Sequence, residues 1–179
     1  MKILTFGASN AKTSINKVLA RFTATLVPGA EIDVLDLSDY DLPIYSEDLE
    51  KQIGHPPAAK AFFEKIGSAD GVIVSFAEHN GSYTAAYKNL FDWASRIDQK
   101  VFQNKPTVYL ATSPGPGGAA SVLAAAKGSA PFFGVDLKAA VSVPSFYDVF
   151  DAKTGRIEDP NALADLIAAA ETLAPPEAA

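Results

Sequence analysis

Short apolar runs alternate along this chain with longer segments of helical periodicity, and this alternation restricts the possible folds more than any other feature. Strands that are separated by helices form parallel sheets whose two faces the helices cover. The sequence therefore predicts an α/β sandwich of three layers around a five-stranded parallel sheet, for which we adopt the strand order 2-1-3-4-5. The predicted strands are 2–6, 31–35, 71–76, 106–112 and 135–143, and the predicted helices are 14–26, 57–66, 84–96, 117–127 and 161–173.

The length and composition fit one domain with a sizeable core, since the chain has 179 residues of which 48% are hydrophobic. It has no internal repeat and no Gly/Ser-rich linker, so we expect a single domain over 1–174 and a disordered tail over 175–179. An acidic connection over 36–50 is long enough for a functional loop. Its carboxylates lack the spacing of a calcium loop, so we expect no metal.

The net charge of −6 disfavours non-specific binding to nucleic acid or to an anionic membrane. The chain has no Cys, which excludes a disulfide scaffold, a cysteine nucleophile and a thiolate metal site. Gly7 interrupts the first apolar run too early for a signal peptide, and no run approaches membrane-spanning length. We therefore expect a soluble, cytoplasmic protein.

The first of three notable loops runs from Gly7 to Asn16 and leads into a helix. Backbone N–H groups and the dipole at the helix start, together with several hydroxyls and Lys12, are suited to binding a phosphate group. An ordinary turn with Ser or Thr as N-cap is the alternative. A nucleoside-triphosphate loop fits less well, because Ala11 stands where that motif has Gly, and the dinucleotide fingerprint fails for lack of further glycines.

The second loop follows a buried strand and precedes an aromatic-rich helix. Residues 80–82, Asn-Gly-Ser, have the composition of a turn, and Gly lets the backbone approach a ligand closely. His79 has the chemistry of a general acid or base, but it lacks a carboxylate partner at motif spacing, so we interpret it as a loop residue or a contact. We expect His55 at the surface. The aromatics of the following helix, expected in the core or an interface, are Tyr87, Phe91 and Trp93.

The third loop, 112–118, contains three Gly and two Pro, which give a rigid bend whose backbone can lie flat against a planar ligand. In the predicted strand order the three loops leave neighbouring strands, so they converge where open α/β sheets bind ligands. The chain has no Gly-x-Ser-x-Gly elbow, and its two His residues do not readily build both a catalytic triad and a metal site.

Taken together, these loops resemble those of the flavodoxin-like NADPH-dependent FMN reductases, which include quinone, azo-dye and chromate reductases. The first loop ends in Ser-x-Asn, and the third matches Ser-Pro-Gly-x-Gly-Gly at 113–118. The second signature, usually Pro-Glu-Tyr-Asn-Gly-Ser and then Lys-Asn-x-x-Asp-Trp, is matched at Glu78, Asn80, Gly81, Ser82, Lys88, Asn89, Asp92 and Trp93. Ala77 departs from the usual Pro, His79 from the usual Tyr, and residues 119–120 from an Arg-containing continuation.

The resemblance implies a flavodoxin-like fold that binds FMN, with the first loop around the phosphate, the second beside the isoalloxazine ring and the third along its pyrimidine edge. It implies no catalytic side chain and no metal, because the cofactors carry the chemistry, with His79 as a possible substrate contact. The implied cofactor-binding residues are Ser9, Lys12, Ser14, Ile15, Asn16, Glu78, His79, Asn80, Gly81, Ser113, Gly115, Gly117 and Gly118.

By this resemblance we expect an FMN-dependent oxidoreductase that takes hydride from NADPH or NADH and passes electrons to a quinone or similar small acceptor by ping-pong exchange. We also expect a homodimer or homotetramer. A flavodoxin-type electron carrier that does not itself oxidise NAD(P)H is the main alternative. A flavin-free binding or regulatory domain on the same fold is a further one, because a fold alone does not determine function.

Overall fold

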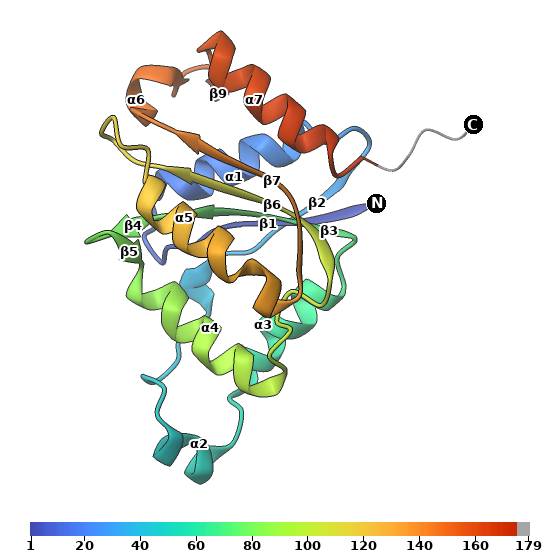
Figure 1. Ribbon diagram of the computed structural model, residues 1–179, viewed down its shortest axis with the longest axis vertical. Helices are drawn as coiled ribbons and strands as arrows, with labels where there is room; N and C mark the ends of the chain where they lie inside the picture. Colours follow the sequence, from blue (N-terminus) through green and yellow to red (C-terminus); the bar gives the residue numbers. More distant parts are fainter. Residues whose placement is uncertain (175–179) are drawn as a thin grey trace.

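The structure, a computed structural model, describes residues 1–174 and has the predicted three layers, with helices on both faces of a central sheet (Figure 1). The sheet is parallel and has the order β2-β1-β3-β6-β7, which confirms the predicted order of five strands. Its strands are β1 (Lys2–Gly7), β2 (Glu31–Val34), β3 (Gly71–Phe76), β6 (Lys105–Thr112) and β7 (Val135–Val143). The tail predicted at 175–179 lies outside the described residues.

The core has two parts because successive side chains of a strand point to opposite faces of the sheet. On β1, for example, Leu4 and Phe6 pack in the cluster on one face, whereas Ile3 packs in the cluster on the other. The helices of the first face are α3 (Pro57–Gly67), α4 (Ala85–Ile97) and α5 (Ala120–Ser129), and those of the second are α1 (Ile15–Thr25) and α7 (Pro160–Glu171). None of the helices within 1–174 has the length and apolar character needed to cross a membrane.

The ends of the helices follow from local sequence. Ser14, Thr84 and Asp159 are N-caps whose side chains accept a hydrogen bond from an N–H of the first turn of α1, α4 and α7. The predicted start of α5 at residue 117 is wrong, because Gly118 and Ala119 both have a φ of +56°, outside the helical region. That helix begins at Ala120.

The aromatic side chains of α4 belong to the core rather than to an exposed face. Trp93 and Tyr87 are buried, and Phe91 is half-buried against the core cluster that contains Tyr87. Of the two expectations for these residues, the core is therefore confirmed. The aromatics pack edge-on, with the rings of Phe76 and Tyr109 4.9 Å apart between centroids.

Several short elements were not predicted. The acidic connection contains η1 (Leu37–Asp39) and α2 (Glu47–Ile53), and the second loop folds into a hairpin of β4 (Glu78–His79) and β5 (Ser82–Tyr83). The remaining short elements are η2 (Ala130–Phe133), α6 (Phe146–Val149), β8 (Phe150–Asp151) and β9 (Arg156–Ile157). The last three lie between β7 and α7, and the β8–β9 hairpin faces α1 across a groove.

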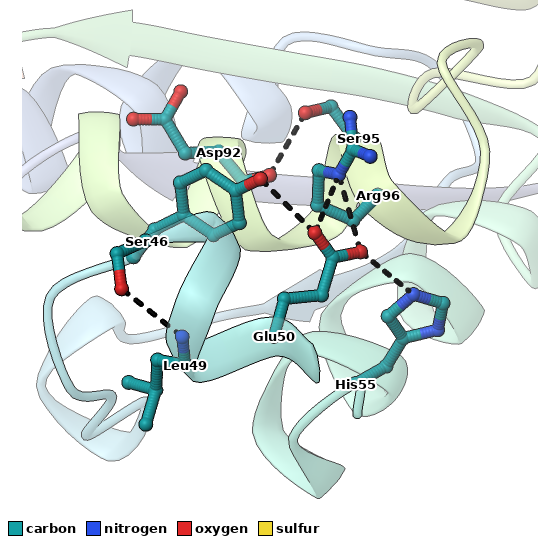
Figure 2. A network of polar contacts seen from close by, with 8 residues as sticks. Ser46, Leu49, Glu50, His55, Asp92, Ser95 and Arg96 are labelled. Atoms are coloured by element: carbon teal, nitrogen blue, oxygen red, sulfur yellow. Dashed lines mark hydrogen bonds and ion pairs between the residues drawn. The ribbon is translucent and has the colours of Figure 1, made fainter. Parts of the chain in front are cut away.

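Helix α2 projects from the sandwich and has no buried residue, so polar contacts rather than apolar packing attach it to α4 (Figures 1 and 2). The carboxylate of Glu50 accepts hydrogen bonds from Arg96 Nε at 3.0 and 3.2 Å and from the Tyr45 hydroxyl at 3.0 Å. His55 lies at the surface as expected, with 34% of its side chain exposed, and its Nε2 lies 3.5 Å from Glu50 Oε1. Trp93 also donates to the Pro43 carbonyl at 2.8 Å.

Candidate functional site

The three loops predicted to converge do so, at the carboxyl ends of β1, β3 and β6. They line a depression of about 240 Å³ together with one residue that follows β7. This edge of the sheet is where chain order reverses between neighbouring strands, which is the usual ligand position in open α/β sheets. The lining residues are Ser9, Thr13, Ser14, Ile15, Asn16, Ala77, Glu78, His79, Thr112, Ser113, Pro114 and Tyr147.

The predicted site residues divide into two groups. Those that line the depression are Ser9, Ser14, Ile15, Asn16, Glu78, His79 and Ser113. Those outside its wall are Lys12, Asn80, Gly81, Gly115, Gly117 and Gly118. Lys12 is exposed and has no hydrogen-bonding or ionic partner within 1–174. A cofactor-binding role for each of these residues stays a prediction.

The start of α1 offers unpaired donors to the depression. Within the described chain, the N–H groups of Ile15 and Asn16 have no acceptor, although Asn16 is only 3% exposed. The Ser14 hydroxyl oxygen accepts from Lys17 N at 3.3 Å, which leaves its own proton free to donate. The helix cap and the phosphate-binding arrangement are therefore compatible. Since buried N–H groups are normally paired, these donors point to an anionic ligand.

The Asn16 side chain ties the first and third loops together beneath this helix start. Its Oδ1 accepts from the Ser75 hydroxyl at 2.7 Å and from Thr112 N at 3.1 Å, and its Nδ2 donates to the Thr112 carbonyl at 3.1 Å. All three contacts are buried. The Asn16 side chain thus positions the loops, and its backbone N–H is the group left to face a ligand.

Two further contacts tie the second loop to the other two. The Thr84 hydroxyl donates to the Ala8 carbonyl at 2.8 Å and so fixes the start of α4 against the first loop. A carboxylate oxygen of Glu78 accepts from Val122 N at 2.9 Å in the first turn of α5. That helix has no capping side chain of its own, so Glu78 satisfies a free N–H there and complements the helix dipole.

The glycines of the third loop differ in whether their surroundings leave room for a side chain. A side chain at Gly118 would collide with Ser142, whose hydroxyl donates to the Gly118 carbonyl at 2.8 Å. Gly115 and Gly117 face open space, so packing within the described residues does not require glycine at either position. The open space beside these two glycines is consistent with the prediction that this backbone borders a flat ligand, which stays a prediction.

Asn80 and Gly81 form the exposed tip of the β4–β5 hairpin, with φ values of +53° and +76°. Two positive φ angles are what a tight hairpin turn of this kind needs, so the predicted turn is confirmed. His79 stands beside this tip, exposed on the strand that borders the depression.

Tyr147 is the lining residue that lies outside the three loops. It is 69% exposed and comes from α6, just after β7. Two hydrogen bonds hold this segment against the third loop, from Ser145 N to the Gly115 carbonyl at 2.9 Å and from Phe146 N to the Ser113 carbonyl at 3.1 Å. Because the fifth predicted strand also ends at this edge of the sheet, the residues that follow it could have been expected near the site, and this was the only indication of Tyr147 in the sequence.

Comparisons with known proteins agree with this architecture. The family model for NADPH-dependent FMN reductase matches residues 1–148. An NAD(P)H-dependent FMN reductase of Pseudomonas aeruginosa is 33% identical over 165 residues, covering 90% of this chain and 87% of that protein. A 2-hydroxy-1,4-benzoquinone reductase of a Burkholderia species is 37% identical over 64% of this chain, which spans only 62% of that protein.

Among solved structures, the flavoenzyme FerB of Paracoccus denitrificans, an NAD(P)H:acceptor oxidoreductase, superposes with a TM-score of 0.79. The match has 26% identity and covers 96% of this chain and 94% of FerB. The family model covers well over half of this sequence, and the match in fold extends over almost all of it. The chain belongs to the family of NADPH-dependent FMN reductases.

Proposed function

We propose that this protein is an FMN-dependent NAD(P)H oxidoreductase that reduces a quinone or a similar small acceptor. The observation that carries the proposal is the pair of unpaired N–H groups at Ile15 and Asn16, in a depression walled by the three loops. The names of the related enzymes, FMN reductase and quinone reductase, support the same reaction. When bound, FMN supplies the ability to accept hydride from a nicotinamide and to pass electrons on.

The role of the chain is to bind and orient the cofactor. The backbone N–H groups of α1 and the hydroxyls of Ser9, Thr13 and Ser14 would hold the phosphate. None of the described residues in the wall is Lys or Arg, so the wall itself offers neutral donors and the helix dipole. The contacts of Asn16, Glu78 and Thr84 would fix these donors before the cofactor arrives.

The size of the depression bears on how substrates reach the cofactor. Pockets that bury drug-sized ligands span about 300–1,000 Å³, whereas this one has about 240 Å³. Part of FMN would therefore stay accessible beside His79 and Tyr147. Donor and acceptor would use this one accessible region in turn, which supports ping-pong kinetics and a substrate-contact role for His79.

The test follows NADPH loss by absorbance in purified protein supplied with FMN, with and without 1,4-benzoquinone. The proposal predicts FMN binding and NADPH oxidation that the quinone accelerates, with parallel lines in double-reciprocal plots. Protein that binds no FMN and oxidises no NADPH would contradict it. Bound FMN that a partner reductase bleaches but NADPH does not would instead indicate an electron carrier.

We also propose that the protein is a cytoplasmic homodimer or homotetramer. Ile53 lies on the projecting helix α2 and Ile44 lies just before it, and their side chains are 52% and 76% exposed. Exposed apolar side chains on a projecting segment with no buried residue are suited to a contact between subunits. Light scattering coupled to size exclusion tests the assembly. A monomer at micromolar concentration would contradict it.

A further inference from the structure

A second groove, of about 340 Å³, lies between the outer face of α1 and the β8–β9 hairpin. Its α1 wall carries Arg21 and Phe22, and its hairpin wall carries Phe150 and Arg156. This groove belongs to none of the three loops described above. Its volume falls in the range of small-molecule sites, which is about 300–1,000 Å³.

The charges in this groove are unbalanced. The arginines of the chain are Arg21, Arg96 and Arg156. Arg96 pairs with Glu50, whereas neither of the other two forms an ion pair within residues 1–174. No acidic residue stands among the described residues that line the groove. Although the protein has a net charge of −6, two guanidinium groups that line one groove attract an anion to that place.

The β8–β9 hairpin carries one carboxylate that already accepts a hydrogen bond within the hairpin. Asp151 lies opposite Arg156 in the β8–β9 ladder. Its Oδ1 accepts from Lys153 N at 2.8 Å, and hydrogen bonds from the backbone of the turn hold the pKa of Asp151 below its ordinary value. Asp151 therefore stabilises the hairpin turn as a carboxylate, and within residues 1–174 it forms no ion pair with the Arg156 guanidinium.

The walls between the charges are apolar and aromatic. Phe22 and Phe150 are half-buried and offer ring surface beside the two guanidinium groups. Guanidinium groups bind phosphate oxygens in pairs of hydrogen bonds, and both guanidinium and phenyl planes stack on flat heterocycles. The chemistry of the groove thus fits a phosphomonoester attached to an aromatic base and sugar, such as a phosphorylated adenosine.

The groove also continues the walls of the phosphate depression. Ile15 lines the depression and Val18 lines the groove, one turn apart on α1, which is about 5 Å along the helix axis. On the facing wall, Tyr147 lines the depression and Phe150 the groove, three residues later. A dinucleotide whose nicotinamide lies near Tyr147 could therefore extend its adenosine along α1.

We propose that Arg21 and Arg156 bind the 2′-phosphate of NADPH, and that this contact makes the enzyme prefer NADPH to NADH. The proposal rests on the proposed function, because it takes the nicotinamide dinucleotide as the substrate of the neighbouring site. It assigns these two arginines to donor specificity, separate from the residues that hold FMN.

The first test measures binding without turnover. Calorimetry on the FMN-loaded protein compares 2′,5′-ADP, 3′,5′-ADP and 5′-AMP, in the unmodified protein and in Arg21→Gln, Arg156→Gln and Lys60→Gln. Lys60 is an exposed cation on α3, on the opposite face of the sheet, and serves as the matched loss of charge. We expect either arginine variant to weaken 2′,5′-ADP binding roughly ten- to a hundredfold, and Lys60→Gln to leave it unchanged.

The second test compares kcat/KM for the two donors. In each arginine variant the value for NADPH should fall by a similar factor while the value for NADH stays constant. Equal losses for both donors, no loss for either, or tighter binding of 3′,5′-ADP than of 2′,5′-ADP would overturn the assignment. If the unmodified protein oxidises neither donor, the proposed function fails, whereas arginine-dependent binding of 2′,5′-ADP would still support the phosphate contact.

Discussion

Replacing Asn16 by Ala removes the side chain that joins the first and third loops, and the consequences can be worked out from its contacts. The substitution leaves three buried polar groups without their partner: the Ser75 hydroxyl and the N–H and carbonyl of Thr112. A buried group left unsatisfied costs about 1–3 kcal/mol. Because water can reach the edge of the depression and relax part of this cost, we expect a loss of about 3 kcal/mol in the free energy of unfolding.

The assay is thermal unfolding followed by circular dichroism, together with a fluorescence titration of FMN. For a domain of this size, each kcal/mol corresponds to roughly 2–4 °C, so Tm should fall by roughly 6–12 °C. FMN should also bind more weakly, because Ser75 and Thr112 belong to the strands that carry the second and third loops. Both effects have one cause, the loss of a fixed spacing between loops.

The matched control is Asn161→Ala. Asn161 is the second residue of α7, as Asn16 is of α1, but it is exposed, and within the described chain its side chain makes no hydrogen bond. This variant should melt within about 1 °C of the unmodified protein, as surface changes usually do. If Asn16→Ala melts within about 2 °C of Asn161→Ala, the reasoning about the tie between the loops is refuted.

Three other changes test separate parts of the structure. Gly7→Ala places a methyl group against the backbone of α1 and should cost more than about 3 kcal/mol, whereas Gly115→Ala, which faces open space, should leave Tm unchanged. A hydrogen bond from Lys65 lowers the pKa of Asp33. In thermal melts at several pH values, Asp33→Asn should therefore lose about 1 kcal/mol of unfolding free energy above the ordinary carboxyl pKa of 3.8. This deficit should vanish as the pH falls through the lowered pKa of Asp33. Glu50→Gln should speed amide hydrogen exchange across α2 and leave the sheet unaffected, and unchanged exchange in α2 would contradict the proposed anchoring.

The strands and the long helices could be predicted because their signals are local. An apolar run such as 71–76, which is buried on both faces of the sheet, can be recognised as a strand from its own residues alone. Ser14 and Thr84 mark helix starts by their own chemistry. The parallel sheet followed from the alternation of elements, whereas the strand order followed from the fold that the family resemblance implies, and with it came the convergence of the three loops.

The short elements could not be predicted in this way, because their stability comes from distant partners. Helix α2 buries no residue and depends on Arg96, 46 positions away from Glu50. The β8–β9 hairpin has strands of two residues each, too short for any periodicity. Its place against α1 follows from packing, so the groove with Arg21 and Arg156 could not be found from the sequence.

The structure gives single side chains roles that the sequence did not indicate. The side chains of Glu78 and Asn16 hold the loops together across 44 and 96 positions of the chain, and the cofactor contacts expected of both residues stay predictions. Nothing in the spacing of the residues indicates such partners. Tyr147 was missed because the segment after the fifth predicted strand has no glycine and matches no motif.

The most direct test of the account compares FMN with riboflavin in fluorescence titrations of the flavin-free protein. The two ligands share the ring and differ in the phosphate, which we place against the N–H groups of Ile15 and Asn16. Two charge-assisted hydrogen bonds at about 1.5 kcal/mol or more each predict that FMN binds roughly a hundredfold more tightly. Equal affinity for the two flavins would contradict the phosphate site at the start of α1.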